Sequence, residues 1–437
     1  MIGFFKKLWR DKRGNALVIA AAALPLVLGS AGLASDTIEW ALWKRQLQRA
    51  ADSAAIAGVY AHVQSASVTD AVTRDLSYNS HVGITTTVST TNPPSTGTRT
   101  ADNNAVRVAL SVQKKLSFSG MFMSATPTIT AVGTATIVPS GKYCVISLEN
   151  TAVTGITATG NADVDMGCGM ITNSTSLTAA VATGSSDVIA SPIAAVGGIP
   201  ASTHWGSGTV LMPFTLAQDD PYANINPPAL PTSNCPNYRV NSNASDAFDA
   251  SDANTSGMSS GFYCVGDMNL AGDVTFPSNS VIVIDGGSLN IGSQAHVSCT
   301  GCTFILTSRT ASTNPSSIGN VDINGGATLN ISAPLTTAPS PVNTYAGIMM
   351  YQDRRAVDGT DANHQSRLNG NSSSFLQGAF YFPSQQVTFN GAAGMSTTCM
   401  YLVARRVLYS GSMNISNTCP ADSGGGGFAG KKVRLVE

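Results

Sequence analysis

The eight cysteines are the residues of this chain whose number and spacing point most directly to chemistry. All of them follow an uncharged N-terminal segment, which puts them on the predicted oxidising side of a membrane. An even number of cysteines in such a compartment favours disulfides. Pairing between neighbours along the chain is the simplest arrangement, although eight cysteines allow many others. The sequence-local pairs are Cys144 with Cys168, Cys235 with Cys264, Cys299 with Cys302, and Cys399 with Cys419.

The run Cys299-Thr300-Gly301-Cys302 has three readings. A redox-active pair would need a thioredoxin-like βαβ pattern around it, and the flanking sequence has none. A zinc site would need a second Cys-x-x-Cys or a pair of histidines, which the sequence lacks. We therefore expect a local structural disulfide.

Two acidic groups resemble calcium sites only superficially. The run Asp267–Asp273 has Ala271 at the fifth position of a calcium loop and Ser278 at the twelfth, where ligands are needed. The second group is spaced by three in a polar loop, where solvated carboxylates are the expectation. It consists of Asp246, Asp249 and Asp252. We predict no metal and no other cofactor.

Acid–base chemistry has one weak candidate. The run Asp353-Arg354-Arg355 follows the apolar strand Tyr345–Tyr351. In β-helix lyases a basic residue abstracts a proton beside acidic, calcium-binding positions, and Arg354 or Arg355 with Asp353 is the nearest approach to that arrangement here. No companion set of carboxylates accompanies it in the sequence. We expect a surface salt bridge. The glycines 424–427 lack the Lys-Ser/Thr of a phosphate loop, and the histidines are scattered (His62, His81, His204, His296 and His364). The chain is predicted not to be an enzyme; a polysaccharide lyase or hydrolase is the least favoured alternative.

Composition excludes several classes of protein. Charged residues make up 11% of the chain, against about 25% in ordinary soluble domains. The formal net charge is −1, so no basic surface for a nucleic acid is expected. The 42 glycines and the abundant Ser, Thr and Asn argue against a coiled coil or a charged disordered tail. They favour short strands joined by tight turns.

The N-terminal segment predicts a membrane anchor. Five cations and one acid occupy residues 1–13, and no charge follows until Asp36. The 19 residues from Asn15 to Leu33 would span about 28 Å as a helix, close to the roughly 30 Å of a bilayer core. The cations place the N-terminus inside the cell. The anchor residues are Asn15, Leu17, Val18, Ile19, Leu24, Pro25, Leu26, Val27, Leu28 and Leu33.

A cleaved signal peptide is the alternative, with Gly32-Leu33-Ala34 as the cleavage site. The apolar run is longer than the 7–15 residues typical of signal peptides. The sequence also stays helical over residues 36–62, with one glycine and no proline. Its apolar residues fall mainly on one face: Ile38, Leu42, Leu47, Ala51, Ala54 and Ala55. We therefore expect a retained anchor.

A family resemblance rests on these N-terminal residues. The run Lys12–Ile19, the apolar helix through Pro25, Asp36, Arg45–Gln48 and Ala50–Gly58 look like the N-terminal module of the Flp (Tad) pilus-assembly proteins, the TadE/TadG-like group. The resemblance covers about 60 residues and weakens beyond them. It implies a pilin-like helix in the bacterial inner membrane and a role in pilus biogenesis.

Two departures narrow the resemblance. Processed pseudopilins of this system carry a Glu five residues after the cleavage-site glycine, whereas Ile19 stands five residues after Gly14. Cleavage by a prepilin peptidase is therefore not expected, and the TadG-like branch fits better. Many TadG-like proteins also carry a von Willebrand-type domain with an Asp-x-Ser-x-Ser metal motif, which this sequence lacks.

Residues 63–140 are predicted to form a small β-rich region. Strand patterns occur at Ala105–Val112 and Thr128–Val138, and a sheet of these strands would cover the apolar face of the outer helix. Between them, Lys114-Lys115 and Met121-Phe122-Met123 suggest either a membrane surface contact or an ordinary cluster at a strand end.

Residues 141–420 repeat a simple unit of apolar-x-apolar, a Gly or Asn step, and apolar-x-apolar. It is plainest at Val321–Ile331 and recurs at Ile156–Met166 and Leu289–Val297. Short strands with such corners predict a parallel β-helix or solenoid, with a β-sandwich as the alternative. A Pro-rich break is expected near residues 226–252, and residues 421–437 are expected to be a Gly-rich linker and a basic tail.

Together these patterns predict a mainly β, single-pass inner-membrane protein. Residues 1–13 would be cytoplasmic, 14–35 would span the membrane, and the bulk would be periplasmic or surface-exposed. Its role would be a structural accessory in Tad pilus assembly, with other Tad or pilin-like proteins as partners and no nucleic acid. The small residues Ala20–Ala23, Gly29, Ala31 and Gly32 would make lateral helix contacts.

The alternative function is a surface adhesin or glycan-binding protein, with envelope polysaccharide as a partner. It requires exposed aromatic side chains along one face of the solenoid. The candidates are Tyr345, Tyr351, Phe380, Tyr381 and Phe382.

Overall fold

The computed structural model describes residues 14–79, 86–97, 99–359, 365–369, 374–391, 394–412, 414–418 and 427–437. They form two compact units, each with its own core. Unit 1 comprises residues 1–138 and 432–437, and unit 2 comprises residues 139–431. Two strands, β3 (Thr128–Ser147) and β28 (Phe428–Leu435), have residues in both units.

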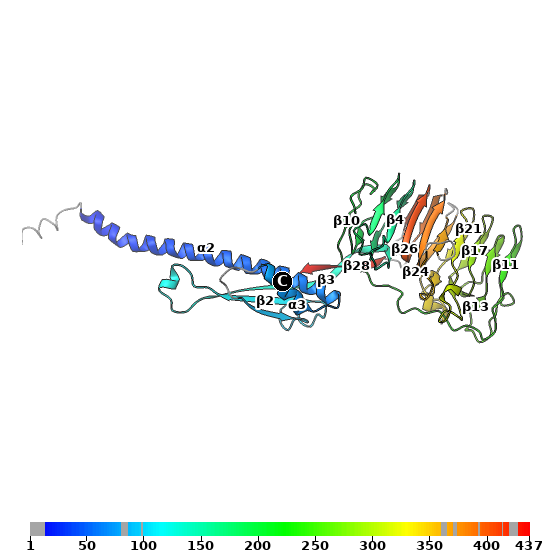
Figure 1. Ribbon diagram of the computed structural model, residues 1–437, viewed down its shortest axis with the longest axis horizontal. Helices are drawn as coiled ribbons and strands as arrows, with labels where there is room; N and C mark the ends of the chain where they lie inside the picture. Colours follow the sequence, from blue (N-terminus) through cyan, green and yellow to red (C-terminus); the bar gives the residue numbers. More distant parts are fainter. Residues whose placement is uncertain are drawn as a thin grey trace, which may run out of the picture. The chain divides into compact units, whose positions relative to one another are not determined.

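Unit 1 consists of a long helix, a short helix and an antiparallel sheet (Figure 1). The helix α2 (Gly14–Val63) runs unbroken for 50 residues, a length of about 75 Å. The helix α3 (Val68–Tyr78) begins at Ser67, whose hydroxyl accepts a hydrogen bond from the Asp70 amide. The sheet contains β1 (Thr87–Thr91), β2 (Val106–Gln113) and β3, with β2 between the other two.

The outer half of α2 packs on this sheet through small side chains. Every second residue of β2 is buried, and the buried side chains contact Leu47, Ala51, Ala54, Ala55 and Val59 of the helix. A Cβ at Gly133 of β3 would lie 2.6 Å from the carbonyl carbon of Ala51, so a glycine there permits the close approach. Ile38 and Leu42, predicted to share this buried face, are exposed instead.

Unit 2 is a parallel β-solenoid whose turns stack strand on strand, which excludes the β-sandwich. Successive turns pair in register: Ile156 with Ala180, and Leu289 with Val321. Along most turns the chain visits three stacks of strands in a fixed order. The first stack contains β10 (Leu211–Met212), β9 (Ile193–Ala195), β6 (Gly169–Thr172), the end of β3, the first part of β26 (Met400–Gly411), part of β24 (Phe375–Gly391), β22 (Ile348–Gln352), β19 (Cys302–Thr307), β16 (Ser280–Asp285) and β13 (Phe262–Val265).

The second and third stacks are built in the same way. The second contains β7 (Ala180–Ala182), β4 (Ile156–Ala158), the later parts of β26 and β24, β23 (Gln365–Leu368), β20 (Val321–Ile323), β17 (Leu289–Ile291), β14 (Met268–Leu270) and β11 (Tyr238–Val240). The third contains β8 (Asp187–Ile189), β5 (Asp163–Asp165), β27 (Asn414–Thr418) and β25 (Gly394–Thr398), and further along β21 (Thr328–Ser332), β18 (His296–Thr300), β15 (Asp273–Thr275) and β12 (Ser245–Ala247). Short 3-10 turns lie at Ser119–Met121, Pro315–Ser317 and Val342–Tyr345.

The order of the turns in space differs from their order along the chain. The chain enters the solenoid at β3, winds out to β10, crosses to β11 at the opposite end and winds back (Figure 1). The last turn then pairs with the first: Leu402 with Val145, Val407 with Ile156, and Ile415 with Val164. We call this junction the seam. It closes the solenoid internally, so that the first and last turns lie side by side.

The crossing from β10 to β11 is made by residues 213–237, which we call the strap. Tyr222, Ile225 and Leu230 of the strap pack on the outward side chains of the first stack, which are apolar. The strands β16, β19 and β22 are consequently buried on both faces. The Pro-rich break expected near 226–252 is thus a covering segment that ends at Asn237, and β11 and β12 already lie within 238–247.

Polar side chains in and beside the first stack hold the strap in place. The hydroxyls of Tyr345 and Tyr351 donate to the carbonyls of Asn226 (2.7 Å) and Ile225 (2.8 Å). The Arg354 guanidinium donates to three strap carbonyls, those of residues 222, 223 and 225. Burial raises the pKa of Tyr345 and raises that of Tyr351 to about 12, so both phenols remain donors at neutral pH.

A buried ion-pair network crosses the seam. Glu149 follows β3 and its side chain is fully buried. Its carboxylate accepts hydrogen bonds from Arg406 (2.8 Å) and Arg405 (3.1 Å) of β26, and Arg406 also pairs with Asp358 at 2.6 Å. Burial alone would raise the pKa of Glu149, but bonds from Thr151 and the two arginines outweigh it and lower the pKa to about 2.

The C-terminal residues differ from the expected linker and tail. Residues 421–426 lie outside the described part of the chain, but Phe428–Leu435 form the strand β28. Phe428 packs with the first stack of unit 2, and Val433 and Leu435 pack on the core of unit 1. Val433 and Leu435 alternate with Lys432 and Arg434, and this alternation makes the segment a strand rather than a free basic tail.

The seam network predicts a pH-dependent contribution to stability. Because the folded-state pKa of Glu149 lies below its ordinary value of 4.5, its ionised form stabilises the fold above about pH 4.5, and this contribution is lost as the pH falls towards 2. We expect Glu149→Gln to lower the free energy of unfolding at pH 7 by about 2–3 kcal/mol. Thermal unfolding of both proteins at pH 7 and pH 3 measures the difference.

The control is Asp322→Asn, which removes the half-exposed pair with Arg367 and should cost under about 1 kcal/mol. An equal loss of melting temperature for Glu149→Gln at pH 3 and pH 7 would contradict the assigned role of the ionised carboxylate.

The strap gives a second prediction. Arg354→Ala removes the donor to three strap carbonyls, and we expect backbone amides within 213–237 to exchange with deuterium roughly tenfold faster. The matched control is Arg355→Ala, because Arg355 bonds to Asp353 rather than to the strap. Unchanged exchange in the Arg354 variant, or equal acceleration in both, would show that Arg354 does not hold the strap.

Candidate functional site

The first half of α2 presents apolar side chains to its surroundings. Val18, Ile19, Leu24, Leu26, Val27, Leu28 and Leu33 are 58–75% exposed, and Pro25 lies within the unbroken helix. Asn15 and Leu17 belong to α2, but their side chains lie outside the described ones. Within the described residues, this is the one helix long and apolar enough to cross a membrane by length and composition, and its most apolar stretch is not buried.

A buried acid marks the outer end of this apolar segment. Asp36 is 4% exposed, and its carboxylate accepts hydrogen bonds from the backbone amides of Phe118 (2.8 Å) and Ser119 (2.5 Å). Glu39 accepts two more from Ser117, at 2.9 and 3.3 Å. These donors belong to the connection between β2 and β3, residues 114–127, which we call the β2–β3 loop.

The contact continues along the helix at Gly32. A Cβ at this glycine would lie 2.3 Å from the Phe118 ring, so the ring packs directly on the helix backbone. Burial alone would raise the pKa of Asp36, but the bonds from Ser119 and Phe118 outweigh it and lower the pKa. Asp36 therefore stays ionised at neutral pH and anchors the loop.

Sequence reasoning missed this role of Asp36. In the sequence Asp36 stands out only as the first charge after the apolar run, and α2 continues through it without a break. The signal that could have identified it is an acid placed directly after an uncharged run of membrane-spanning length, because such a carboxylate needs local donors.

The cysteines of unit 2 form structural disulfides. Cys144 is bonded to Cys168, Cys235 to Cys264, and Cys299 to Cys302, which are three of the sequence-local pairs. Cys399 is also disulfide-bonded, and Cys419 lies outside the described residues. The Cys235–Cys264 bond ties the end of the strap to β13.

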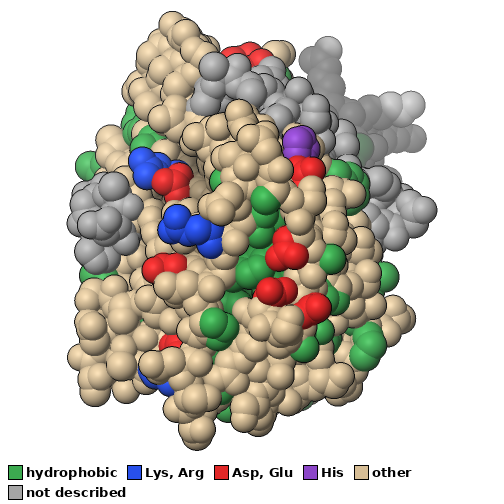
Figure 2. Space-filling view, turned by 90° about the vertical axis from the view of Figure 1, so that its right-hand side faces the viewer, with side chains coloured by type: hydrophobic (Ala, Val, Ile, Leu, Met, Phe, Trp, Pro, Cys, Tyr) green, Lys and Arg blue, Asp and Glu red, His purple; other side chains and the backbone are tan. Residues whose placement is uncertain are grey.

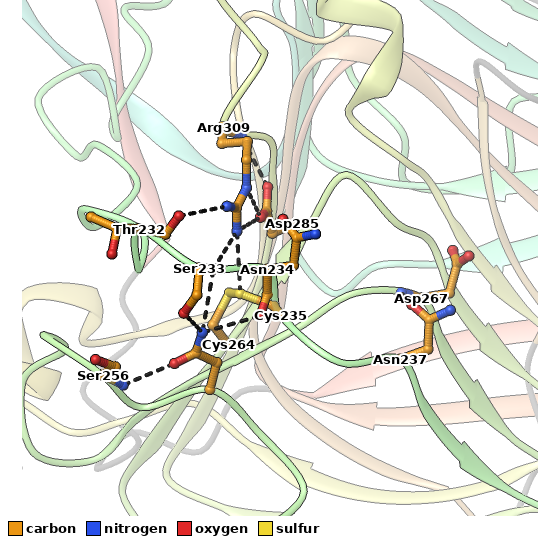
Figure 3. Close-up of a disulfide and its surroundings, with 11 residues drawn as sticks. Thr232, Ser233, Asn234, Cys235, Asn237, Ser256, Cys264, Asp267, Asp285 and Arg309 are labelled. Atoms are coloured by element: carbon orange, nitrogen blue, oxygen red, sulfur yellow. Dashed lines mark hydrogen bonds and ion pairs between the residues drawn. A yellow bond between two sulfur atoms is a disulfide. The ribbon is translucent and has the colours of Figure 1, made fainter.

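The surroundings of Cys235–Cys264 have the ligand types of a metal site but not its chemistry (Figure 3). Asp285 lies with the two sulfurs, but the thiols are consumed in the disulfide and the carboxylate pairs with Arg309 at 2.5 Å. Arg309 also donates to the Ser233 carbonyl at 3.0 Å. A polar hollow of about 360 Å³ adjoins this cluster. These bonds fasten the strap end to the solenoid.

The acidic groups of the loops do not converge on a common point. Asp273 pairs with His296 at 2.7 Å, and Asp267 accepts a bond from the Ser288 amide. Asp246 accepts from the Tyr238 hydroxyl, and Asp249 accepts from Ser251. Each carboxylate is therefore used in a separate local contact.

The three residues 353–355 make two structural contacts, an ion pair between Asp353 and Arg355 and a contact of Arg354 with the strap. Asp353 is buried and pairs with Arg355 at 2.6 Å, while Arg354 points to the strap carbonyls. Burial alone would raise the pKa of Asp353, but bonds from Arg355 and Thr307 outweigh it and lower the pKa. The three residues thus play structural parts in the fold.

The aromatic stripe required for a glycan-binding surface is not exposed, so this prediction is wrong. The five candidates are at most 3% exposed: Tyr345, Tyr351, Phe380, Tyr381 and Phe382. They lie in or beside the first stack, whose inward side chains face the solenoid core and whose outward side chains lie under the strap. The sequence showed apolar strands there but not the segment that covers them.

Comparison with protein families gives a match at the N-terminal helix. Residues 14–65 match the Tad family model, which describes TadE/G-like Flp pilus-assembly proteins. The matched span is α2 with the two residues that follow it, and it does not separate the TadG-like branch from the TadE-like one. Neither a search of the curated proteins nor a search of the solved structures returns a match. The family match and the exposed apolar helix together indicate a membrane-anchored protein with a role related to the Tad machinery.

The contact between Asp36 and the β2–β3 loop can be tested by hydrogen exchange. Asp36→Asn removes the charge that receives two backbone amides, and we expect the amides of residues 118 and 119 to exchange roughly tenfold faster. The control is Glu39→Gln, for which we expect an effect confined to Ser117. Unchanged protection of residues 118 and 119 in the Asp36 variant would contradict the anchoring role.

Proposed function

We propose that this chain is a membrane-anchored, non-catalytic accessory component of Tad pilus assembly. Its first helix spans the bacterial inner membrane with residues 1–13 in the cytoplasm. The solenoid stands on the outer side and offers an interaction surface to other parts of the pilus machinery or to pilin-like proteins.

The observation that carries the proposal is the division of α2 into two halves. The Tad family model matches the whole of this helix. Its first half is apolar and exposed, and its second half packs on the small sheet of unit 1. A single helix whose first half suits a bilayer and whose second half packs on a sheet is the organisation expected of a pilin-like membrane module.

Three features support an outward orientation. The cation excess in residues 1–13 favours a cytoplasmic N-terminus. Disulfides persist in oxidising compartments and are rare in the cytoplasm, and those described all lie in unit 2. Trp40, Trp43 and Lys44 follow the apolar segment, and aromatic and basic side chains are typical of the membrane–water interface.

Lateral association through small residues of α2 would join this anchor to other helices. Gly29 has open space where a Cβ would stand, so its face is free for a neighbouring helix. Gly32 was assigned to the same face, but Phe118 of the same chain covers it. The proposed contact face is therefore Ala20–Ala23, Gly29 and Ala31.

The solenoid surface suits a neutral partner. Figure 2 views the side of unit 2 on which β11 and β13 lie, where charged side chains are few: the basic ones lie to the left, near acidic ones, and further acidic ones lie right of centre. Outward positions of the second stack carry Asn269, Asn290 and Thr157, with half-buried side chains. Such a surface would bind through hydrogen bonds and shape rather than through net charge.

The test is to delete the gene in its host and count surface pili by electron microscopy. We expect pili to be lost, to return with the full-length protein, and not to return with a variant in which a flexible linker replaces residues 139–431. This variant keeps residues 432–437, because Val433 and Leu435 pack on the core of unit 1. Membrane fractions of each strain confirm that the protein is present.

A point variant tests the helix contacts separately. Gly29→Leu fills the proposed contact face and should reduce pilus number, whereas Val27→Leu keeps a large apolar residue and should not. Unchanged pilus number in the deletion strain would refute a role in assembly. Restoration by the linker variant would remove the solenoid from that role.

A further inference from the structure

We propose that the β2–β3 loop is a second membrane contact, in which Met121, Phe122 and Met123 enter the outer leaflet of the bilayer that α2 crosses. The partner is the boundary between lipid headgroups and acyl chains. This inference rests on the proposed membrane span of α2.

The loop runs back along α2 towards the apolar segment. It leaves β2 at Lys114, whose ammonium lies 4.8 Å from the centre of the Trp43 ring. It then meets Glu39 through Ser117, and it reaches Asp36 and Gly32 through Phe118. From Trp43 to Gly32 the helix descends about 16 Å. Figure 1 shows the loop beside α2, reaching away from the sheet.

The length of the helix sets the depth of the loop. The uncharged run from Asn15 to Leu33 fills about 28 Å as a helix, so its last residues lie at the outer edge of the hydrocarbon core. Phe118 packs on Gly32, at that edge. The Asp36 contact fixes the loop there, because both amides at its start bind one carboxylate.

The tip of the loop has the side chains of a lipid contact. Met121 and Phe122 are 76% and 75% exposed, and Met123 is 54% exposed. The Phe118 and Phe122 rings meet edge to face at 5.3 Å between centroids, which joins the exposed tip to the ring on the helix. No charged residue occurs from Leu116 to Pro127, while Lys114 and Lys115 precede the tip and can reach headgroup phosphates.

Continuity with the span selects lipid as the occupant. The sequence left open a membrane contact or an ordinary cluster at a strand end, and a strand-end cluster would bury these side chains within unit 1. They are instead exposed beside the one described segment that is long and apolar enough for a bilayer. The loop and α2 would then hold unit 1 at two points and restrict its rotation about the helix axis.

The test is photo-crosslinking of the full-length protein reconstituted in bilayers of phosphatidylethanolamine and phosphatidylglycerol. The photoreactive residue p-benzoylphenylalanine replaces Phe122 in one variant, Leu26 in a second and Tyr78 in a third. Leu26 reports on the span itself, and Tyr78, which is 81% exposed on α3, is an aromatic control. We expect lipid adducts at positions 122 and 26, and roughly tenfold fewer at position 78.

The outcomes separate the two proposals. Adducts at position 26 without adducts at position 122 would overturn the loop contact and leave the span standing. Absence of adducts at position 26 would overturn the span and with it the proposed function. Protein adducts at position 122 in place of lipid adducts would identify a second copy as the occupant and overturn the lipid contact. Adding Asp36→Asn to the position 122 variant should lower its lipid adducts several-fold, and an unchanged yield would refute the anchoring of the loop by Asp36.

Discussion

The arrangement of unit 1 depends on a single helix that must satisfy two environments, with the change between them at Asp36. Before this residue α2 carries exposed apolar side chains, and after it the helix buries alanines against a sheet. Burying the ionised Asp36 carboxylate would destabilise the fold unless the carboxylate accepted hydrogen bonds. The backbone amides of the β2–β3 loop supply them, and this is why a loop distant in sequence lies against the helix.

In unit 2, coverage of apolar surface plays the corresponding part. Strands of the first stack are apolar on both faces, so a solenoid made only of its turns would leave one of those faces in water. The strap removes this exposure, and it also sets the order of the turns, because it carries the chain from β10 to the far end. The first and last turns then meet at the seam, where their strands pair and Glu149 adds ion pairs with two arginines.

The sequence predicted local structure well and long-range arrangement poorly. Alternating runs such as Leu289–Ile291 gave strands, and the glycine and asparagine steps gave corners, because both signals are local. The continuous runs Val281–Ile284 and Phe304–Leu306 carried a further signal, burial on both faces, which would have warned against an exposed aromatic stripe.

The order of turns could not be predicted, because the edge of one parallel turn offers the same hydrogen bonds as the edge of any other.

For the candidate site, the charge-free run and the family resemblance located the anchor, and the Tad family match covers the same helix. The contact with the β2–β3 loop depends on residues separated by more than 80 positions, and no local pattern encodes it. The strand β28 was mistaken for a tail because its basic residues obscured the alternation of Val433 and Leu435.

The central claim is that α2 crosses the inner membrane once, with residues 1–13 inside and with the rest of unit 1 and all of unit 2 outside. Protease digestion of intact spheroplasts that carry the full-length protein with an N-terminal epitope tag tests it most directly. The account predicts that the solenoid is digested from outside while the tag survives in a short membrane-bound fragment that ends beyond Asp36. A full-length protein that resists digestion until the membrane is opened, or a solenoid found soluble and free of the tag before protease is added, would contradict it.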